Sequence, residues 1–214
     1  MPIPTRLIAI EGGEGAGKST QAVRLAGAIG ADLTREPGGS SIGEQIRILL
    51  LDPSLGHLVP RAELHLMLAA RAQHVAERIS PALGAGRSVV VDRFSGSTLA
   101  YQGYGRGLPI DEVAQACGLA TGGLWPDLSV LLDLPLELAL ARRADRHATL
   151  PGAEPDRIES EQIDFHARVN GGFRRIADDD PEHWVVVDGS RSEDEVAVEV
   201  LAVVRARLGT GSTR

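Results

Sequence analysis

The segment LIAIEGGEGAGKST, residues 7–20, decides how this chain is organised. A short apolar run ends in a turn rich in glycine, and a helical pattern follows. The spacing of Gly12, four further residues and then Gly17, Lys18 and Ser19 is that of a phosphate-binding loop between a strand and a helix. A chance glycine-rich turn is the alternative, but every fixed position and the flanking pattern match the motif. We therefore expect this segment to bind a nucleoside triphosphate.

Each residue type in the loop has a physical role in holding phosphate. Glycine lets the backbone wrap around phosphate oxygens in conformations that a Cβ atom would forbid. The amides of the loop and the helix N-terminus behind it direct partial positive charge at the anion. Lys18 would reach the β- and γ-phosphates, and the Ser19 hydroxyl would coordinate Mg²⁺. The expected ATP-binding residues are Gly12, Gly13, Glu14, Gly15, Ala16, Gly17, Lys18, Ser19 and Thr20.

The composition is that of an ordinary globular protein. The 214 residues are 43% hydrophobic and 24% charged, which suits a single domain over residues 1–214 with a substantial core. The net charge of −7 argues against a nucleic-acid polymer or an anionic membrane as the main partner. The single cysteine, Cys117, excludes an internal disulfide and a cysteine metal cluster. With no signal-like segment and no apolar run of membrane-spanning length, we expect a cytoplasmic protein.

Strand-like and helix-like segments alternate along the chain. Besides residues 7–11, we expect strands at 31–34, 88–92, 128–133 and 184–188. We expect helices at 20–29, 42–51, 61–83, 110–120, 136–146, 158–176 and 193–208, and an irregular loop at 147–155. This alternation predicts an α/β fold, a doubly wound parallel sheet of five strands flanked by helices. Because Gly12, Arg35, Asp92 and Asp133 follow strand ends, they are expected at the one edge where ligands bind.

The dipeptide Asp92-Arg93 directly follows an apolar strand and is a candidate for phosphate chemistry. An aspartate in this place commonly holds Mg²⁺, although Asp133 and Asp188 also end strands and position alone does not choose among them. The arginine distinguishes Asp92, because a guanidinium at the sheet edge offers a bidentate fork to phosphate oxygens. A structural ion pair between Asp92 and Arg93 is the alternative interpretation.

Three arginines, Arg142, Arg143 and Arg146, cluster where a helix enters the loop at 147–155. They are either a solvated helix C-terminus, where the helix dipole favours cations, or part of a lid that closes on the transferring phosphoryl group. Their spacing alone does not decide between the two.

Four further segments resemble those of bacterial thymidylate kinases. They are TREPGG at 34–39, DRF at 92–94, STLAYQG at 97–103 and DRIE at 156–159, in the order found in that family. The resemblance spans residues 7–188, and the REPGG and YQG segments are far more specific than the phosphate-binding loop. It implies a P-loop NTPase type of fold with a short lid at about 142–157.

The resemblance also implies a reaction and a set of site residues. The family transfers the γ-phosphoryl group of ATP to dTMP with Mg²⁺, which gives dTDP and ADP for dTTP synthesis. The implied catalytic residues are Lys18, Arg93, Arg142 and Arg146, because members whose loop lacks a basic residue take an arginine from the lid. The implied metal-holding residues are Ser19 and Asp92. The implied dTMP-binding residues are Glu14, Arg35, Pro37, Met67, Arg71, Arg93, Thr98, Tyr101 and Gln102.

Within that set, Glu14 resembles the acidic residue that approaches the 3′-hydroxyl of the sugar. Arg71 resembles the arginine that reads the base, and Tyr101 would exclude a 2′-hydroxyl. Arg93 would bridge the acceptor phosphate and the donor. The family forms homodimers across helices, which suits the segment 61–83.

The sequence departs from the family pattern at three places. Met67 stands where a phenylalanine usually stacks on the thymine, the lid segment 147–155 is longer than expected, and the second strand is short. Another phosphate-loop kinase is the nearest alternative function; a nucleoside kinase would need a base such as Glu11 or Glu36. A nucleotide-gated switch is a second alternative, but the Asn-Lys-x-Asp guanine signature is missing from the sequence.

Overall fold

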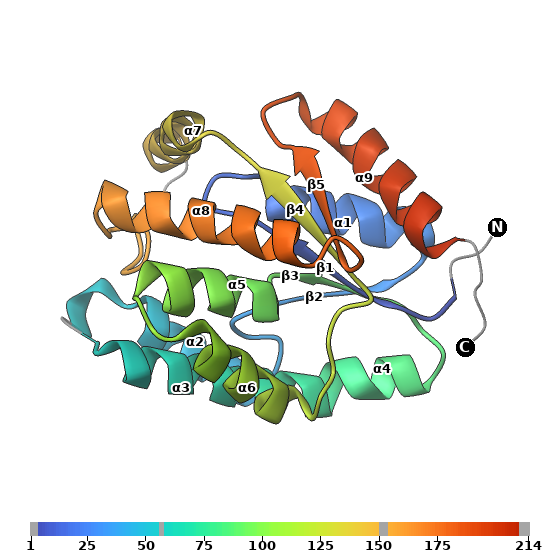
Figure 1. Cartoon of the computed structure of the whole chain (residues 1–214), viewed down its shortest axis with the longest axis horizontal. Coiled ribbons are helices and arrows are strands. Elements are labelled where there is room, and N and C mark those ends of the chain that lie inside the picture. The colour runs from blue at the N-terminus through green and yellow to red at the C-terminus, as the bar shows by residue number, and fades with distance from the viewer. Residues whose placement is uncertain (1–3, 56–57, 150–153, 210–214) are drawn as a thin grey trace.

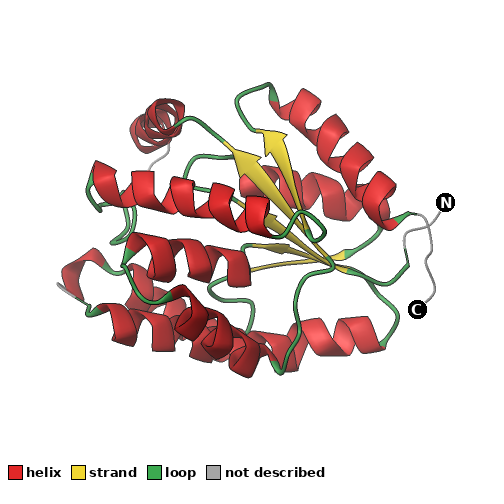
Figure 2. Cartoon of the chain, in the orientation of Figure 1, coloured by secondary structure: helices red, strands yellow, loops and turns green. Residues whose placement is uncertain are grey.

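The computed structural model describes residues 4–55, 58–149 and 154–209. Five parallel strands form one sheet in the order β2-β3-β1-β4-β5, with helices on both faces (Figures 1 and 2). The strands are β1 (Leu7–Glu11), β2 (Asp32–Arg35), β3 (Val89–Asp92), β4 (Leu128–Asp133) and β5 (Trp184–Asp188). The predicted doubly wound α/β sheet is confirmed.

Among the described residues, one or more helices separate each pair of consecutive strands (Figure 2). The α-helices are α1 (Lys18–Ile29), α2 (Ser41–Leu51), α3 (Pro60–His74), α4 (Ser80–Gly84), α5 (Ser95–Thr98), α6 (Ile110–Thr121), α7 (Leu136–Thr149), α8 (Ile163–Asp179) and α9 (Glu193–Leu208). Shorter helical segments are the 3₁₀ turn η1 (Pro53–Leu55) and the π-helical segments η2 (Val75–Ile79) and η3 (Leu99–Gly105). None of the described helices is both long and apolar enough to cross a membrane.

The central strand β1 is buried on both faces, as its continuous apolar run predicts. Ile8 and Ile10 pack in a cluster with α1 and α9, whereas Leu7 and Ala9 pack against η2 and α4 on the opposite face. Successive side chains of a strand point to opposite faces, so a strand covered on both sides needs apolar residues at every position. Burying each of the larger side chains contributes about 1.5–3 kcal/mol, which fixes the strand that leads into the phosphate-binding loop.

The parallel register brings the carboxyl ends of the strands to one edge. Asp92 at the end of β3 lies opposite Ile10 of β1 and Arg35 of β2, and Glu11 lies opposite Leu131 of β4. The segments that follow these strands therefore begin side by side, although they are far apart in the sequence. This edge is where ligands bind in open α/β sheets.

The structure differs from the predicted elements in the segment 95–105, which is helical although its sequence pattern predicts no helix. Its glycines lower helix propensity, so sequence patterns give no helix signal there. Tertiary packing overrides this, because Gly105 lets α8 approach closely: a Cβ atom at Gly105 would lie 2.8 Å from the Phe165 ring and 2.9 Å from Val169. Gly105 thus serves helix contact rather than a loop.

Three other boundaries also differ. The helix predicted at 61–83 is α3 and α4 joined by the π-helical turn η2, in which the amide of Ser80 bonds to the carbonyl of Val75, five residues back. This wider turn directly precedes Pro81, whose ring would clash with the carbonyls of a regular helix. Helix α7 continues to Thr149, and α8 begins at Ile163, because Ile158 belongs to a preceding turn. Residues 150–153 of the predicted lid lie outside the described residues.

Candidate functional site

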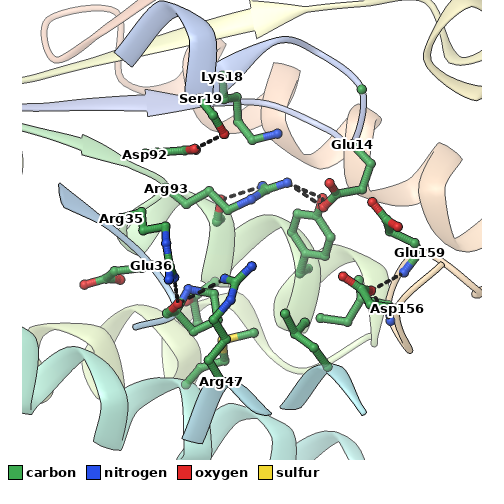
Figure 3. Close-up of a pocket in the computed structure, with 18 of the residues that line it drawn as sticks. Glu14, Lys18, Ser19, Arg35, Glu36, Arg47, Asp92, Arg93, Asp156 and Glu159 are labelled. Atoms are coloured by element: carbon green, nitrogen blue, oxygen red, sulfur yellow. Dashed lines mark hydrogen bonds and ion pairs between the residues drawn. The ribbon is translucent and has the colours of Figure 1, made fainter. Parts of the chain in front are cut away.

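A cavity of about 500 Å³ opens at the carboxyl edge of the sheet (Figure 3). Its volume is that of an ordinary small-molecule site. Its walls include most of the sequence-predicted site residues: Glu14, Gly15, Gly17, Lys18, Ser19, Thr20, Arg35, Pro37, Met67, Arg71, Asp92, Arg93, Thr98, Tyr101, Gln102, Arg142 and Arg146. Gly12, Gly13 and Ala16 belong to the same loop but do not line the cavity.

The phosphate-binding loop joins β1 to α1 in a conformation that demands glycine. Gly12 has a φ of +144°, and a Cβ atom there would lie 2.8 Å from the carbonyl oxygen of Leu132. The Lys18 Nζ atom donates a hydrogen bond of 2.6 Å to the Gly13 carbonyl, across the mouth of the loop. Burial and the nearby guanidinium of Arg93 lower the pKa of Lys18 to about 8, although neighbouring carboxylates act to raise it. The loop thus presents a buried, positively charged cradle suited to phosphate.

Ser19 and Asp92 form an oxygen pair beside this loop. The Ser19 hydroxyl donates to Asp92 Oδ2 at 2.5 Å, while Asp92 Oδ1 is buried and accepts no hydrogen bond from the described residues (Figure 3). Hydroxyl and carboxylate oxygens are hard ligands that suit Mg²⁺, which takes one or two protein ligands and completes its shell with water and phosphate. No set of three His, Cys, Asp or Glu side chains in the described residues could hold a metal by itself. The pair therefore fits a magnesium ion carried by a nucleotide.

The two other strand-ending aspartates do not compete for this role. Asp133 pairs with Arg174 at 2.9 Å, and Asp188 accepts hydrogen bonds from the amide and hydroxyl of Ser190. Neither carboxylate lines the cavity. The structure thus agrees with the choice of Asp92 that the following arginine suggested in the sequence.

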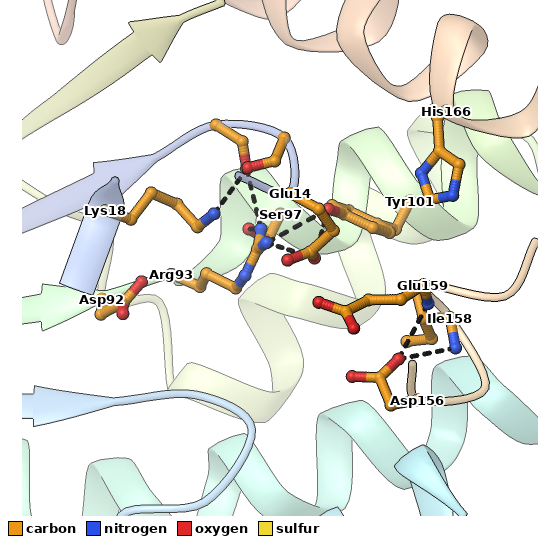
Figure 4. Close-up of polar contacts among 12 residues, drawn as sticks. Glu14, Lys18, Asp92, Arg93, Ser97, Tyr101, Asp156, Ile158, Glu159 and His166 are labelled. Atoms are coloured by element: carbon orange, nitrogen blue, oxygen red, sulfur yellow. Dashed lines mark hydrogen bonds and ion pairs between the residues drawn. The ribbon is translucent and has the colours of Figure 1, made fainter. Parts of the chain in front are cut away.

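Arg93 lines the cavity, and its side chain extends toward Glu14 (Figure 4). Its Nη1 atom donates to the Gly12 carbonyl at 2.9 Å and to Ser97 Oγ at 3.1 Å, and its Nη2 atom donates to Glu14 Oε1 at 2.5 Å and to the Tyr101 hydroxyl at 3.2 Å. Its ion-pair partner is thus Glu14, and not the adjacent Asp92 that the structural alternative named. These contacts hold the guanidinium between the loop and η3.

Glu14 and Arg93 hold each other ionised. Burial by itself would raise the pKa of Glu14, but the charges of Arg93 and Lys18 lower it to about 2. Burial lowers the pKa of Arg93, and the Glu14 carboxylate more than reverses this effect. The Tyr101 hydroxyl also donates to Glu14 Oε1, at 2.8 Å. The cavity therefore keeps an ionised carboxylate beside the Arg93 cation.

The far wall of the cavity comes from α3, α5 and η3 and combines apolar and polar groups. Met67, Arg71, Thr98 and Gln102 face this part of the cavity. Arg71 is only 3% exposed, and its Nε atom donates to Glu36 Oε2 at 2.7 Å. A wall of this composition suits a heterocyclic base that has both an apolar face and a polar edge.

Neither carboxylate suggested as a base for the nucleoside-kinase alternative is free to act. Glu36 lines the cavity, but its two oxygens are held by Arg71 and by His74, the latter at 2.9 Å. Glu11 lies outside the cavity wall and accepts hydrogen bonds from the Phe94 amide and the Ser97 hydroxyl. Burial raises the pKa of Glu11 to about 7.

A second group of arginines lies at the entrance from β2 and α2. Arg35 donates to the Pro37 carbonyl at 3.0 Å and to Glu44 at 2.8 Å. Arg47 also donates to the Pro37 carbonyl, at 3.1 Å, and lines the cavity (Figure 3). Burial and the charge of Arg35 lower the pKa of Arg47. Sequence reasoning missed Arg47, because it lies on one face of an ordinary helix with no motif around it.

The arginines of α7 differ in their surroundings. Arg142 lines the cavity and donates to the Gly189 carbonyl at 2.9 Å, and Arg146 lines it while paired with Glu159. Arg143 is buried away from the cavity, with its Nη1 atom 3.3 Å from His166 Nε2. Of the three clustered arginines, the cavity therefore includes the two that the resemblance named.

Three residues of the DRIE segment, Asp156, Ile158 and Glu159, line the cavity (Figure 4). Asp156 Oδ1 accepts hydrogen bonds from the amides of Ile158 and Glu159, at 2.9 and 2.8 Å. Arg157 turns away and pairs with Glu63 at 2.8 Å. In the sequence, this segment is recognisable only as a family motif, which by itself indicates no role for its residues at the site.

Comparisons with known proteins agree with the geometry. Residues 10–200 match the family model described as thymidylate kinase. The chain is 49% identical over 208 residues to the thymidylate kinase of Desulfovibrio desulfuricans, with 94% of this chain and 95% of that protein covered. It is 45% identical over 209 residues to that of Geotalea uraniireducens, with 95% and 98% covered. Among solved structures, the thymidylate kinase of Ehrlichia chaffeensis superposes with a TM-score of 0.75 at 30% identity, covering 94% of this chain and 98% of that one.

Proposed function

The chain belongs to the thymidylate kinase family, and we infer that it transfers the γ-phosphoryl group of ATP to dTMP, which gives dTDP and ADP. The single observation that carries this conclusion is the position of Arg93. Its guanidinium lies between a phosphate-binding loop and a second wall suited to a base, 2.9 Å from the Gly12 carbonyl and 3.2 Å from the Tyr101 hydroxyl. A cation at that point can contact phosphates from both nucleotides.

We propose that the loop residues 12–20 hold ATP, with Lys18 at the β- and γ-phosphates. Lys18 spans the loop through its bond to the Gly13 carbonyl, and its lowered pKa reflects burial beside Arg93. Phosphate oxygens would replace the Gly13 carbonyl as its partner and favour its charged form. Ser19 and Asp92 would hold the Mg²⁺ of the nucleotide, which neutralises phosphate charge during transfer.

We propose that dTMP lies against the wall formed by α3, α5 and η3, which we call the nucleoside wall. Arg71 would contact the base edge, Met67 its face, and Thr98 and Gln102 its remaining polar atoms, since all four line that part of the cavity. Glu14 and Tyr101 would contact the sugar, and Arg35 and Pro37 would lie beside the acceptor phosphate, near the additional arginine Arg47.

The reaction needs no general base in this arrangement. The attacking phosphate oxygen of dTMP is already ionised at neutral pH, so the work of the protein is to align two anions and to offset their repulsion. We propose that Arg93 does this at the centre and that Arg142 and Arg146 do so from the lid side of a single domain. Arg146 would exchange Glu159 for a phosphoryl oxygen when the substrates bind, because both partners lie on the cavity wall.

A steady-state phosphotransfer assay over dTMP, dUMP, dCMP, dGMP and thymidine tests the proposed function. We expect the highest kcat/KM for dTMP with ATP and Mg²⁺. The highest turnover on thymidine would indicate a nucleoside kinase instead. Bound ATP without phosphotransfer to any monophosphate would indicate a nucleotide-gated switch.

We also propose that the enzyme is a homodimer that uses the outer face of α3 and η2. Ala69, Ala72 and Ala76 are exposed and follow one another at helical spacing on one face. Such short side chains would let a helix of a second copy approach closely. Light scattering after gel filtration measures the mass in solution: we expect twice the chain mass. Ala69→Arg should give monomers, and a monomeric parent protein would contradict the proposal.

A further inference from the structure

Glu63 of α3 is a fully buried carboxylate behind the nucleoside wall, and the reaction as described does not use it. It is 0% exposed. Its Oε1 atom accepts from Gln102 Nε2 at 2.9 Å and from Arg106 Nε at 3.1 Å. Its Oε2 atom accepts from Arg106 Nη2 at 2.9 Å and pairs with Arg157 Nη1 at 2.8 Å. Two guanidinium groups and one amide thus surround a single carboxylate.

The charge of Glu63 is settled by these partners. Burial by itself would raise its pKa, but the hydrogen bonds from Arg106 and Gln102 and the charge of Arg106 lower the pKa below its ordinary value. An ionised carboxylate can only accept hydrogen bonds. It therefore dictates which end of the neighbouring side-chain amide turns toward it.

The Glu63 carboxylate sets the orientation of the Gln102 side-chain amide, which lines the cavity. Because its NH₂ group must donate to Glu63, its carbonyl oxygen Oε1 is left for the cavity. Within the described part of the chain, no donor bonds to that oxygen. Gln102 is only 1% exposed, and its hydrogen bond to the Glu63 carboxylate sets which end of the amide faces the cavity. The nucleoside wall thus offers an acceptor at this position.

We propose that Glu63 is a positioning residue that sets base specificity, because it forces Gln102 to present a hydrogen-bond acceptor to the base. This inference rests on the proposed binding of dTMP at this wall. Thymine and uracil carry an N3–H donor beside the O4 acceptor, whereas cytosine carries an N3 acceptor beside an amino donor. Arg71, on the same wall, supplies donors only. Together, Gln102 and Arg71 match the thymine edge and oppose the cytosine edge at both atoms.

A purely structural role for the cluster makes a different prediction. If Glu63 only joined α3 to η3, its loss would weaken all nucleotides alike. Under our proposal, a neutral amide at position 63 can accept from or donate to Gln102, so the Gln102 amide is free to turn over. Discrimination between bases would then fall, even where stability changes little.

The variants Glu63→Gln and Glu161→Gln test this difference. Glu161 is a matched control, because it pairs with Arg106 Nη1 at 2.5 Å in the same cluster but neither touches Gln102 nor lines the cavity. Steady-state kinetics with dTMP and dCMP give the ratio of their kcat/KM values. We expect Glu63→Gln to lower that ratio by about tenfold or more, mainly through the two KM values, and Glu161→Gln to leave it within about threefold. Equal losses for both substrates in Glu63→Gln would overturn the proposal.

A second measurement uses the unaltered protein and therefore does not depend on whether Glu63→Gln folds. In 5-methyl-dCMP an N3 acceptor and a 4-amino donor replace the N3–H and O4 of dTMP with almost no change of shape. Calorimetric titration should give a Kd roughly tenfold higher than for dTMP, and a Kd within about threefold of that for dTMP would overturn the proposal. Failure of the unaltered protein to phosphorylate dTMP would contradict the proposed function instead, and this binding comparison needs no turnover.

Discussion

Replacing Arg93 by alanine and by glycine separates two effects: the contribution of its guanidinium to phosphotransfer and the free-energy cost of its backbone conformation. Arg93 has a φ of +70°, in the left-handed region that costs an L-residue about 1–2 kcal/mol. Alanine removes the guanidinium and keeps this cost, whereas glycine removes both. Both variants leave Glu14 without its ion-pair partner, so that loss cancels when they are compared with each other.

We expect the same loss of phosphotransfer in both variants. A positioned cationic donor in a site closed to water contributes about 2.7–4 kcal/mol to the transition state, so kcat/KM for dTMP should fall by about 10²–10³-fold. ATP affinity should stay close to the parent value, because the loop amides and Lys18 remain in place. A coupled spectrophotometric assay measures the first quantity, and titration with a non-hydrolysable ATP analogue measures the second.

The stabilities of the two variants should differ. Alanine at a positive φ destabilises a protein relative to glycine, so Arg93→Gly should unfold in urea with a free energy about 1 kcal/mol higher than Arg93→Ala. Turnover within about tenfold of the parent, which is about 1.4 kcal/mol, would refute the bridging role of Arg93. Equal stability of the two variants would refute the cost assigned to its backbone.

Three further changes test other parts of the site. Met67→Phe should tighten dTMP binding by about 0.5–1.5 kcal/mol in a calorimetric titration through stacking on the base, and unchanged affinity would mean that the wall repacks. The pKa of Glu11 is raised from 4.5 to about 7 in the folded protein. Between these pH values the folded state holds a proton that the unfolded state releases, so the free energy of unfolding falls as the pH rises from 4.5 to 7. Glu11→Gln should abolish that fall and be more stable at pH 8, by up to about 3 kcal/mol, in urea titrations; an unchanged slope would contradict this. Ser19→Ala should raise the Mg²⁺ concentration for half-maximal turnover roughly tenfold, whereas Ser19→Thr, which keeps the hydroxyl, should not; equal effects would contradict metal binding there.

Local patterns predicted most of the sheet and the phosphate-binding loop. The strand β1 and the loop after it are contiguous in the sequence. The strand requires an apolar residue at every position and the loop requires glycine where the backbone turns, so both are recognisable from consecutive residues. The segment 95–105 could not be predicted in this way, because its helix depends on contact with α8 and its own glycines argue against it. The same holds for Arg47, which only the packing of α2 turns toward the cavity.

The roles of charged side chains depended on contacts between distant segments. Asp92, Asp133 and Asp188 all end strands, and only Asp92 accepts a hydrogen bond from Ser19 at the edge of the sheet. Arg93 was expected to pair either with its neighbour or with phosphate, and it lies against Glu14, which is 79 positions away. Spacing along the chain carries no information about such pairs.

The sequence by itself thus predicted the phosphate-binding loop and the family that the chain resembles, because those signals lie in short runs of residues with fixed spacing. Tertiary structure alone decided which carboxylates are buried, which arginine each one holds, and which end of Gln102 faces the cavity. The physical reason is that charge and hydrogen-bond direction are set by burial and by partners, and both arise only when distant segments pack together.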